Sequence, residues 1–508
     1  MPDKVRVRFA PSPTGGLHLG GVRTVLYNYL FAKQNGGDFI LRIEDTDQSR
    51  YVSGAEEYIF ETLKWCGLEP DESVHHGGEF GPYRQSERKN LYKTYAEDLV
   101  QKGYAYYAFD SPEELDRMRM ELRSESNPTP QYDQSTRIKM RNSLSLSEDE
   151  VDELHKNQTP YVIRIKIPEK ETVSFTDMIR GIVSFDTSLV DDKVLLKADG
   201  MPTYHLAVVV DDYLMKISHA FRGEEWLPSA PVHVLLWRYL FGEDQMPQWA
   251  HLPLILGPNG KLSKRDGVKY GFPVFAMTWK DPKTGEQTEG FRERGFLPEA
   301  FLNMLAMLGW NDGTEQEIFS LSELIEKFSM ERVHSSGAKF DFEKAKWFNH
   351  EWIKRTDVSK YQKQVKSIFE EKGLEISDDS YFEKVLTVVK DRCTVLPDFW
   401  EHSHFFFAAP NEYNTTPIQV KWNDDKRYFF QTFSTSLASI TNWSAHSLEN
   451  IFKQLAEQAA IKPGELQLPF RIMLVGDKFG PGVFNIAEVL GKEETITRIN
   501  SALNAFKF

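Results

Sequence analysis

The first forty residues alternate between short apolar segments and polar turns. Alternating apolar and arginine positions predict a strand over residues 4–9. A loop rich in proline and glycine follows at residues 10–16, and a helical apolar periodicity then runs to a stop signal at residues 35–37. Residues 39–43 form a second apolar run. The order strand, loop, helix, strand predicts a βαβ unit at the start of a nucleotide-binding sheet.

The middle of the chain is less regular. Residues 53–67 have the pattern of a helix that opens with a Ser-x-x-Glu capping box. Helical and strand-like segments are mixed over residues 84–200, where alternation at residues 162–167 predicts a strand. Residues 201–212, apolar at their centre, predict a return to a buried strand of the first sheet. This order indicates a sheet interrupted by an α+β insertion.

The apolar periodicity becomes helical in the last part of the chain. Residues 296–308, 448–459 and 488–503 each carry apolar positions at helical spacing. No convincing strand alternation follows them. The C-terminal third is therefore predicted to be all-helical.

Composition narrows the class of protein. A chain of 508 residues suggests three or four domains of about 150 residues each. Its two cysteines exclude a disulfide scaffold and a four-thiolate zinc site. The absence of a long apolar run or a signal peptide predicts a cytosolic protein without a membrane span. The net charge of −14, from 61 basic and 75 acidic residues, argues against general nucleic-acid binding.

A first candidate motif lies where the glycine-rich loop enters the first helix. Residues 11–21 read Pro-Ser-Pro-Thr-Gly-Gly-Leu-His-Leu-Gly-Gly. A helix N-terminus favours phosphate, Gly20 lets a phosphate approach the backbone, and His18 adds a donor. The alternative interpretation is a glycine-rich turn with a surface histidine.

A second candidate motif is the basic segment at residues 261–265, which reads Lys-Leu-Ser-Lys-Arg. Two lysines on a flexible loop can close over a triphosphate and stabilise the charge on leaving pyrophosphate. The alternative is a solvated basic turn. Both motifs in this order, each next to a predicted strand, favour the phosphate interpretation.

These motifs resemble the HIGH and KMSKS signatures of class I aminoacyl-tRNA synthetases, here HLGG and KLSKR. Five further segments make the chain similar to the bacterial-type glutamyl-tRNA synthetases: residues 42–47, 83–88, 202–207, 210–212 and 222–226. The resemblance implies a ligase that forms carbon–oxygen bonds. Such an enzyme activates L-glutamate with ATP and Mg²⁺ to glutamyl-adenylate and transfers it to the 3′ end of tRNA(Glu).

The resemblance also implies roles for single residues. The catalytic residues would be His18, Lys261 and Lys264. ATP would be bound by His18, Gly20, Glu225, Ile255, Lys261, Leu262, Ser263, Lys264 and Arg265. Glutamate would be bound by Arg8, Ala10, Ser12, Glu44, Tyr204 and Arg222. Contacts with tRNA would come from Thr46, Arg50, Arg164 and Arg392.

Elementary chemistry agrees with the glutamate set. The carboxylate of Glu44 suits an α-amino group, and the forked donors of Arg8 and Arg222 suit two carboxylates. An arginine in the pocket disfavours glutamine, whose neutral amide would leave the guanidinium unpaired. Taken alone, Arg8 on an alternating strand is better explained by exposure to solvent, and only the set of motifs favours the pocket.

The implied fold is a Rossmann-like α/β catalytic domain with an inserted α+β acceptor-binding domain, then a stem-contact region and an all-α anticodon-binding domain. The expected boundaries are residues 1–83 with 204–260, 84–203, 261–345 and 346–508. Some positions depart from the family pattern. Gly21 stands where the signature has a second histidine, and the insertion has no cysteine, so no zinc is expected. Residues 270–295 form a longer stretch than in many relatives, without an assigned role.

Other functions remain open at this stage. A non-discriminating enzyme would also charge tRNA(Gln) with glutamate, although Arg392 lies near a position used to check the third anticodon base. A helix-surface arginine explains Arg392 equally well. A glutamine-specific enzyme or a truncated relative that modifies a base fits the helical C-terminus less well. A small-molecule nucleotidyltransferase and a non-catalytic tRNA-binding module are the alternatives from other classes. The expected state is a monomer that binds tRNA through local basic strips on an acidic body.

Overall fold

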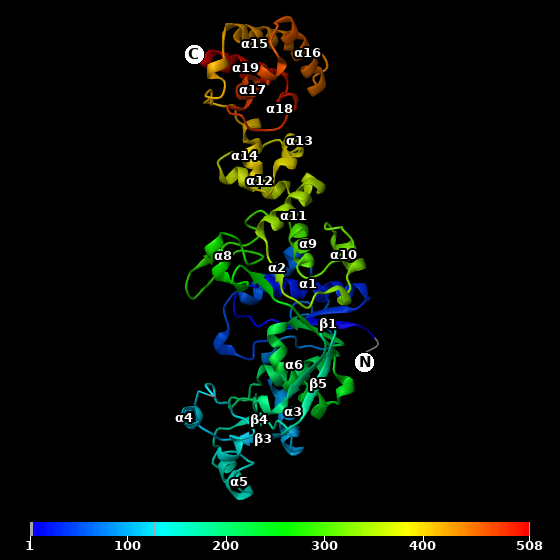
Figure 1. Cartoon of the computed structure of the whole chain (residues 1–508), viewed down its shortest axis with the longest axis vertical. Helices are drawn as coiled ribbons and strands as arrows, with labels where there is room; N and C mark the ends of the chain where they lie inside the picture. The colour runs from blue at the N-terminus through cyan, green and yellow to red at the C-terminus, as the bar shows by residue number, and fades with distance from the viewer. Residues whose placement is uncertain (1–3, 126, 507–508) are drawn as a thin grey trace. The chain divides into compact units, whose positions relative to one another are not determined.

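The computed structural model describes residues 4–125 and 127–506, which form two compact units (Figure 1). The first unit runs to Glu293 and also contains Phe301–Phe342. The second unit consists of Arg294–Ala300 and the residues from Glu343 onward. Each unit has its own hydrophobic core.

The centre of the first unit is a sheet of six described strands in the order β2-β1-β8-β9-β5-β6. Neighbouring strands are parallel except for the β5–β6 hairpin. The strands are β1 (Arg6–Phe9), β2 (Asp38–Leu41), β5 (Thr172–Asp177), β6 (Gly181–Asp186), β8 (His219–Gly223) and β9 (Gln248–Leu252). Parallel strands need crossovers, supplied by helices α1 (Leu19–Gln34), α2 (Ala55–Cys66), α6 (Tyr204–Leu214) and α7 (Ala230–Leu240). The predicted βαβ opening is confirmed as β1, α1 and β2.

Three local predictions are wrong. Residues 201–212 hold helix α6 rather than a strand, because α6 is buried from Leu206 to Asp212 and an apolar run cannot distinguish a buried helix from a buried strand. Helix α2 begins after Gly54 without a side-chain cap, so the Ser-x-x-Glu box is not used. The helix predicted over 488–503 is divided at Gly491, which has a φ of 82°.

The insertion contributes to two sheets. Its strands β5 and β6 extend the central sheet, whereas β3 (Ala105–Ala108), β4 (Val162–Ile165) and β7 (Val194–Leu196) form a separate antiparallel sheet. Helices α3 (Lys89–Gln101), α4 (Pro112–Leu122) and α5 (Glu148–Lys156) accompany this small sheet. The mixed α+β character and the strand predicted at residues 162–167 are both confirmed.

The basic motif lies after the central sheet. A small sheet joins β10 (Ile255–Gly257) to β11 (Gly260–Lys261) and β14 (Ala338–Lys339). Helix α8 (Lys264–Tyr270) follows β11 and is capped by Ser263 and Asp266. The hairpin of β12 (Trp279–Lys280) and β13 (Gln287–Thr288) comes next. Helices α9 (Pro298–Met307) and α10 (Leu321–Lys327) complete this part of the chain.

The second unit is helical throughout its described residues, as predicted. Its core is rich in phenylalanine: the ring of Phe452 lies 5.1 Å from that of Phe433 and 5.6 Å from that of Phe470. The helices are α11 (Phe342–Arg355), α12 (Gln362–Glu371), α13 (Asp379–Val389), α14 (Asp398–Ser403), α15 (Asp424–Leu437), α16 (Ala445–Gln458), α17 (Pro463–Val475), α18 (Val483–Leu490) and α19 (Lys492–Ala505). In the part of the chain that the structure describes, every helix is too short or too polar to cross a bilayer.

Candidate active site

A cavity of about 630 Å³ opens near the carboxyl ends of the parallel strands in the first unit. The glycine-rich loop after β1, the segment after β2 and the end of β8 all reach it. It is lined by every residue predicted to bind glutamate: Arg8, Ala10, Ser12, Glu44, Tyr204 and Arg222. Gly20, Thr46, Arg50, Glu225 and Lys261 also line it. Residues as far apart in the sequence as Arg8 and Lys261 therefore line one cavity.

Arg8 and Glu44, which line the cavity, belong to a buried cluster that also contains Arg42 and Asp212. Arg8 Nε donates to both carboxylate oxygens of Asp212, at 3.1 and 3.2 Å. Arg42 Nη2 donates to Glu44 Oε1 at 2.9 Å, and its Nη1 lies 2.9 Å from Asp212 Oδ1. The charge of Arg8 is therefore already compensated in the free protein. Sequence reasoning assigned no role to Arg42, although it lies in one of the segments that carry the resemblance.

The cluster shifts its two carboxylates in opposite directions. Burial would raise the pKa of Asp212, but the charges of Arg8 and Arg42 outweigh it and lower that pKa. Burial dominates at Glu44 and raises the pKa of its carboxyl group, despite the ion pair with Arg42. Asp212 is thus the more firmly ionised partner.

Arg222 is held differently from Arg8. Its Nε donates to His251 Nε2 at 2.9 Å, and its Nη1 donates to Tyr204 Oη at 3.2 Å and to His233 Nδ1 at 3.0 Å. No carboxylate of the described residues forms an ion pair with it. Its Nη2 is buried and, within residues 4–125 and 127–506, has no hydrogen-bond partner. These donors are suited to a carboxylate that enters the cavity.

His18 stands at the start of helix α1, where the sequence predicts a phosphate contact. It is the N-cap residue and its side chain makes no capping bond. Burial, assisted by the charge of Lys261, lowers the pKa of His18 to about 4, so the ring is neutral near pH 7. A Cβ atom added at Gly20 would meet no atom within 4 Å, so a ligand can approach the backbone there.

The two lysines of the basic motif lie in different surroundings. Lys261 lines the cavity, and its Nζ lies 3.3 Å from Glu225 Oε1. Lys264 begins helix α8, and its Nζ donates to Glu286 Oε2 at 2.8 Å, in the stretch to which the sequence assigned no role. Leu262, Ser263, Lys264 and Arg265 follow Lys261 along the chain, and the backbone carbonyl of Ile255 accepts from the N–H of Leu262 at 2.9 Å, but none of these five residues lines the cavity.

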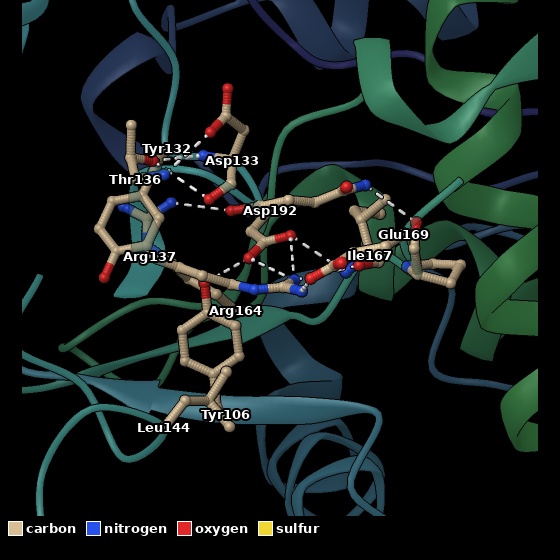
Figure 2. A network of polar contacts seen from close by, with 12 residues as sticks. Tyr106, Tyr132, Asp133, Thr136, Arg137, Leu144, Arg164, Ile167, Glu169 and Asp192 are labelled. Atoms are coloured by element: carbon tan, nitrogen blue, oxygen red, sulfur yellow. Dashed lines mark hydrogen bonds and ion pairs between the residues drawn. The ribbon is translucent and has the colours of Figure 1, made fainter. Parts of the chain in front are cut away.

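The predicted tRNA contacts are spread over the chain. Thr46 and Arg50 line the cavity, while Arg392 is exposed in the second unit. Arg164 lies in a polar network of the insertion, where its Nη1 donates to the backbone carbonyl of Asp192 at 2.9 Å (Figure 2). Its guanidinium lies 4.0 Å from the centre of the Tyr132 ring.

The same network has a charged centre. The Asp192 carboxylate accepts from Tyr106 Oη at 2.6 Å and from Arg137 Nη1 at 3.2 Å (Figure 2). Arg164 is thereby held by contacts that also support the fold of the insertion. Arg164 as a whole residue is only 8% exposed.

A resident metal has no candidate site in the described ranges, since no group of three His, Cys, Asp or Glu side chains has suitable geometry.

Comparison with known proteins agrees with this geometry. Residues 4–347 match the family model described as "tRNA synthetases class I (E and Q), catalytic domain", and residues 346–503 match "Anticodon binding domain". The chain is 51% identical to the glutamate–tRNA ligase of Bacteroides fragilis and 52% identical to that of Phocaeicola vulgatus, over 99% of each chain. It is also similar to a crystal structure of a glutamate tRNA ligase from Elizabethkingia meningosepticum in complex with its amino acid. That similarity has a TM-score of 0.93 and 48% identity, and covers 99% of this chain and 100% of the other.

Proposed function

The chain belongs to the family of class I tRNA synthetases for glutamate and glutamine, and we propose that it is a glutamate–tRNA ligase that charges tRNA(Glu). The observation that carries this proposal is the pocket chemistry. Arg222 offers buried, unpartnered Nη2 donors in the same cavity as the carboxylate of Glu44. A substrate that carries an amino group and a carboxylate complements these two groups, and Arg8 in the same cavity offers a guanidinium for a second carboxylate.

In the proposed reaction, a carboxylate oxygen of glutamate attacks the α-phosphorus of ATP. The bond to pyrophosphate breaks, and glutamyl-adenylate forms. A ribose hydroxyl at the 3′ end of tRNA then attacks the activated carbonyl carbon, and AMP leaves. The enzyme needs no covalent intermediate, so catalysis consists of positioning and charge stabilisation.

The phosphate-binding residues have separable roles in this reaction. Neutral His18 donates one hydrogen bond to a phosphate oxygen, and Gly20 gives the nucleotide room at the start of α1. Lys261 and Lys264 stabilise the negative charge on leaving pyrophosphate. Glu225, Ile255, Leu262, Ser263 and Arg265 complete the proposed ATP site. Mg²⁺ bound to ATP supplies further charge neutralisation when the nucleotide enters.

Selection of glutamate follows from the two arginines. Glu44 binds the α-amino group, and Arg8 and Arg222, assisted by Ala10, Ser12 and Tyr204, bind the carboxylates. A bound glutamine would place a neutral amide against one buried guanidinium. Such an unpaired buried charge is costly, so glutamine should be rejected.

The remaining proposals concern the domain boundaries, the tRNA contacts, the oligomeric state and the cellular compartment. We propose the domain boundaries given above, with β5 and β6 of the insertion counted in the catalytic sheet. Thr46, Arg50 and Arg164 would contact the acceptor end, and Arg392 the anticodon. We expect a monomer that works in the cytoplasm.

Side-by-side charging tests this function. Purified enzyme is incubated with ATP, Mg²⁺ and either L-glutamate or L-glutamine, on tRNA(Glu) and on tRNA(Gln). We expect glutamate on tRNA(Glu) only. Equal charging of both tRNAs with glutamate would indicate the non-discriminating enzyme, and the absence of any charging would reject the proposal.

A further inference from the structure

Behind Arg222, the central sheet places two buried side chains that the reaction above does not use. His251 and Asp177 are 0% and 1% exposed. His251 is paired with Arg222 in the register of β8 and β9, and Asp177 ends β5, the next strand in the sheet. Adjacent parallel strands thus bring these side chains together at one edge, in a line that leads to the cavity.

Hydrogen bonding defines the proton position in this line. A guanidinium has donors only, so His251 Nε2 must accept from Arg222 Nε at 2.9 Å. The ring proton therefore lies on Nδ1, which is 2.6 Å from Asp177 Oδ2. The other oxygen of Asp177 accepts from the backbone N–H groups of Ile179 and Arg180, each at 3.0 Å.

The protonation states are consistent with this pattern. Burial lowers the pKa of His251, which keeps the imidazole neutral. Burial would raise the pKa of Asp177, but the hydrogen bonds that it accepts outweigh this effect and lower the pKa. Asp177 is therefore ionised, and it reaches Arg222 only through a neutral ring.

This arrangement leaves Arg222 both oriented and available. Its direct partners are the uncharged groups of His251, Tyr204 and His233, which occupy Nε and Nη1. A carboxylate in direct contact would compete with a substrate carboxylate for the same donors, as Asp212 does at Arg8. An interposed imidazole avoids that competition and still fixes the plane of the guanidinium.

We propose that Asp177 and His251 are positioning residues that hold Arg222 ready for a carboxylate of the amino-acid substrate. This inference rests on the proposed function, because it assumes that the cavity binds glutamate. A preoriented guanidinium binds a carboxylate more tightly than a mobile one, since less conformational freedom is lost on binding. Loss of the pair should weaken binding of glutamate without weakening that of ATP.

Three variants test the proposal by tRNA-dependent ATP–pyrophosphate exchange. His251→Phe keeps a ring but removes both hydrogen bonds, and Asp177→Asn lets an amide donate to Nδ1, which would turn a second N–H toward Arg222 Nε. Each should raise the KM for glutamate about tenfold or more and leave the KM for ATP within about twofold. His251→Gln keeps an acceptor for Arg222 and should recover most of the affinity for glutamate.

A matched control comes from β8, the strand that carries Arg222. His219 lies on β8, is 9% exposed and contacts Ser218 rather than Arg222. His219→Phe should keep the wild-type KM for glutamate. Thermal melting of each variant establishes that it is folded at the assay temperature. If His251→Phe does not fold, the contrast between Asp177→Asn and His251→Gln carries the same test.

Several results would overturn the proposal. The first is an equal rise in the KM for ATP and in the KM for glutamate. The second is a KM for glutamate in His251→Gln as high as in Asp177→Asn, and the third is a similar rise of this KM in His219→Phe. Each would show that the pair serves only the fold. Failure of the wild-type enzyme to activate glutamate would instead reject the proposed function, before any variant is compared.

Discussion

At the scale of single residues, the two arginines of the cavity differ in how their charges are balanced. Arg8 is in direct contact with Asp212, whereas Arg222 is surrounded by uncharged partners. Arg222 is thus the stronger candidate for an incoming carboxylate. Burial also sets the protonation state of His18, because it lowers the pKa of the ring and keeps it neutral. A neutral imidazole can donate only one hydrogen bond to a phosphate oxygen.

Lys264 carries a prediction about chemistry. Lys264→Ala should slow glutamate-dependent ATP–pyrophosphate exchange by about 100-fold, because a positive charge is lost where pyrophosphate leaves. Binding of tRNA, measured by filter retention, should change little. The matched control is Lys269→Ala, an exposed lysine on the same helix α8, which should keep the wild-type rate. Wild-type charging by Lys264→Ala would refute the catalytic assignment.

His219 carries a prediction about stability. Burial lowers its pKa to about 4 in the fold, whereas an unfolded histidine titrates near 6.5. As the pH falls from 6.5 toward 4, the unfolded chain binds a proton that the folded chain does not, so the free energy of unfolding decreases. Wild type should lose up to about 1.4 kcal/mol per pH unit more than His219→Phe over this range. Urea unfolding at pH 7.5 and pH 5 measures the difference, and equal losses would contradict it.

At the scale of elements, the stretch between α8 and α9 packs against both of the motifs that are proposed to bind phosphate. The ring of Phe275 lies 5.9 Å from that of His18, and a Cβ atom at Gly16 would come within 2.9 Å of Trp279. Glu286, in the turn between β12 and β13, binds Lys264. In this conformation Lys264, the proposed catalytic lysine, contacts the hairpin and does not line the cavity.

The ion pair of Lys264 with Glu286 should therefore oppose ATP binding. Glu286→Gln should lower the KM for ATP by at most about fivefold, because a partly exposed ion pair contributes about 0–1 kcal/mol. Exchange kinetics at low and high ionic strength provide the measurement. The difference between variant and wild type should shrink in about 0.5 M salt, where surface charges are screened. An increase in the KM for ATP would show that Glu286 instead helps to present the lysine.

At the scale of the whole molecule, the net charge of −14 coexists with a predicted affinity for tRNA. Nucleic-acid binding depends on local cations, so an acidic body limits nonspecific binding without preventing recognition. The helical second unit places Arg392 on its exposed surface. A match to an anticodon-binding domain covers this part of the chain.

Arg392→Ala should raise the KM for tRNA(Glu) several-fold and leave the KM values for ATP and glutamate unchanged. The reason is that Arg392 belongs to the part of the chain that matches an anticodon-binding domain and is not among the residues that line the cavity. Aminoacylation with each substrate varied in turn separates these effects. An unchanged KM for tRNA would identify Arg392 as an ordinary helix-surface arginine.

Much of this architecture could be predicted because its signals are local. The βαβ opening, the HLGG and KLSKR motifs and the helical C-terminus depend on neighbouring residues, whose periodicity and turn chemistry act over a few positions. Helix α6 could not be predicted in the same way. Burial on all sides removed the polar face that distinguishes a helix from a strand.

The partners of the charged side chains could not be predicted from local signals, because they depend on the order of the strands in the sheet. Asp177 lies 74 positions before His251 in the sequence, and no local pattern indicates that β5 of the insertion joins β9. The sheet brings them into contact because parallel strands from distant segments end at one edge. The sequence motifs, through their resemblance to a known family, were therefore enough to suggest glutamate, ATP and tRNA. The folded sheet was needed to show which arginine is already neutralised and which is free for a carboxylate.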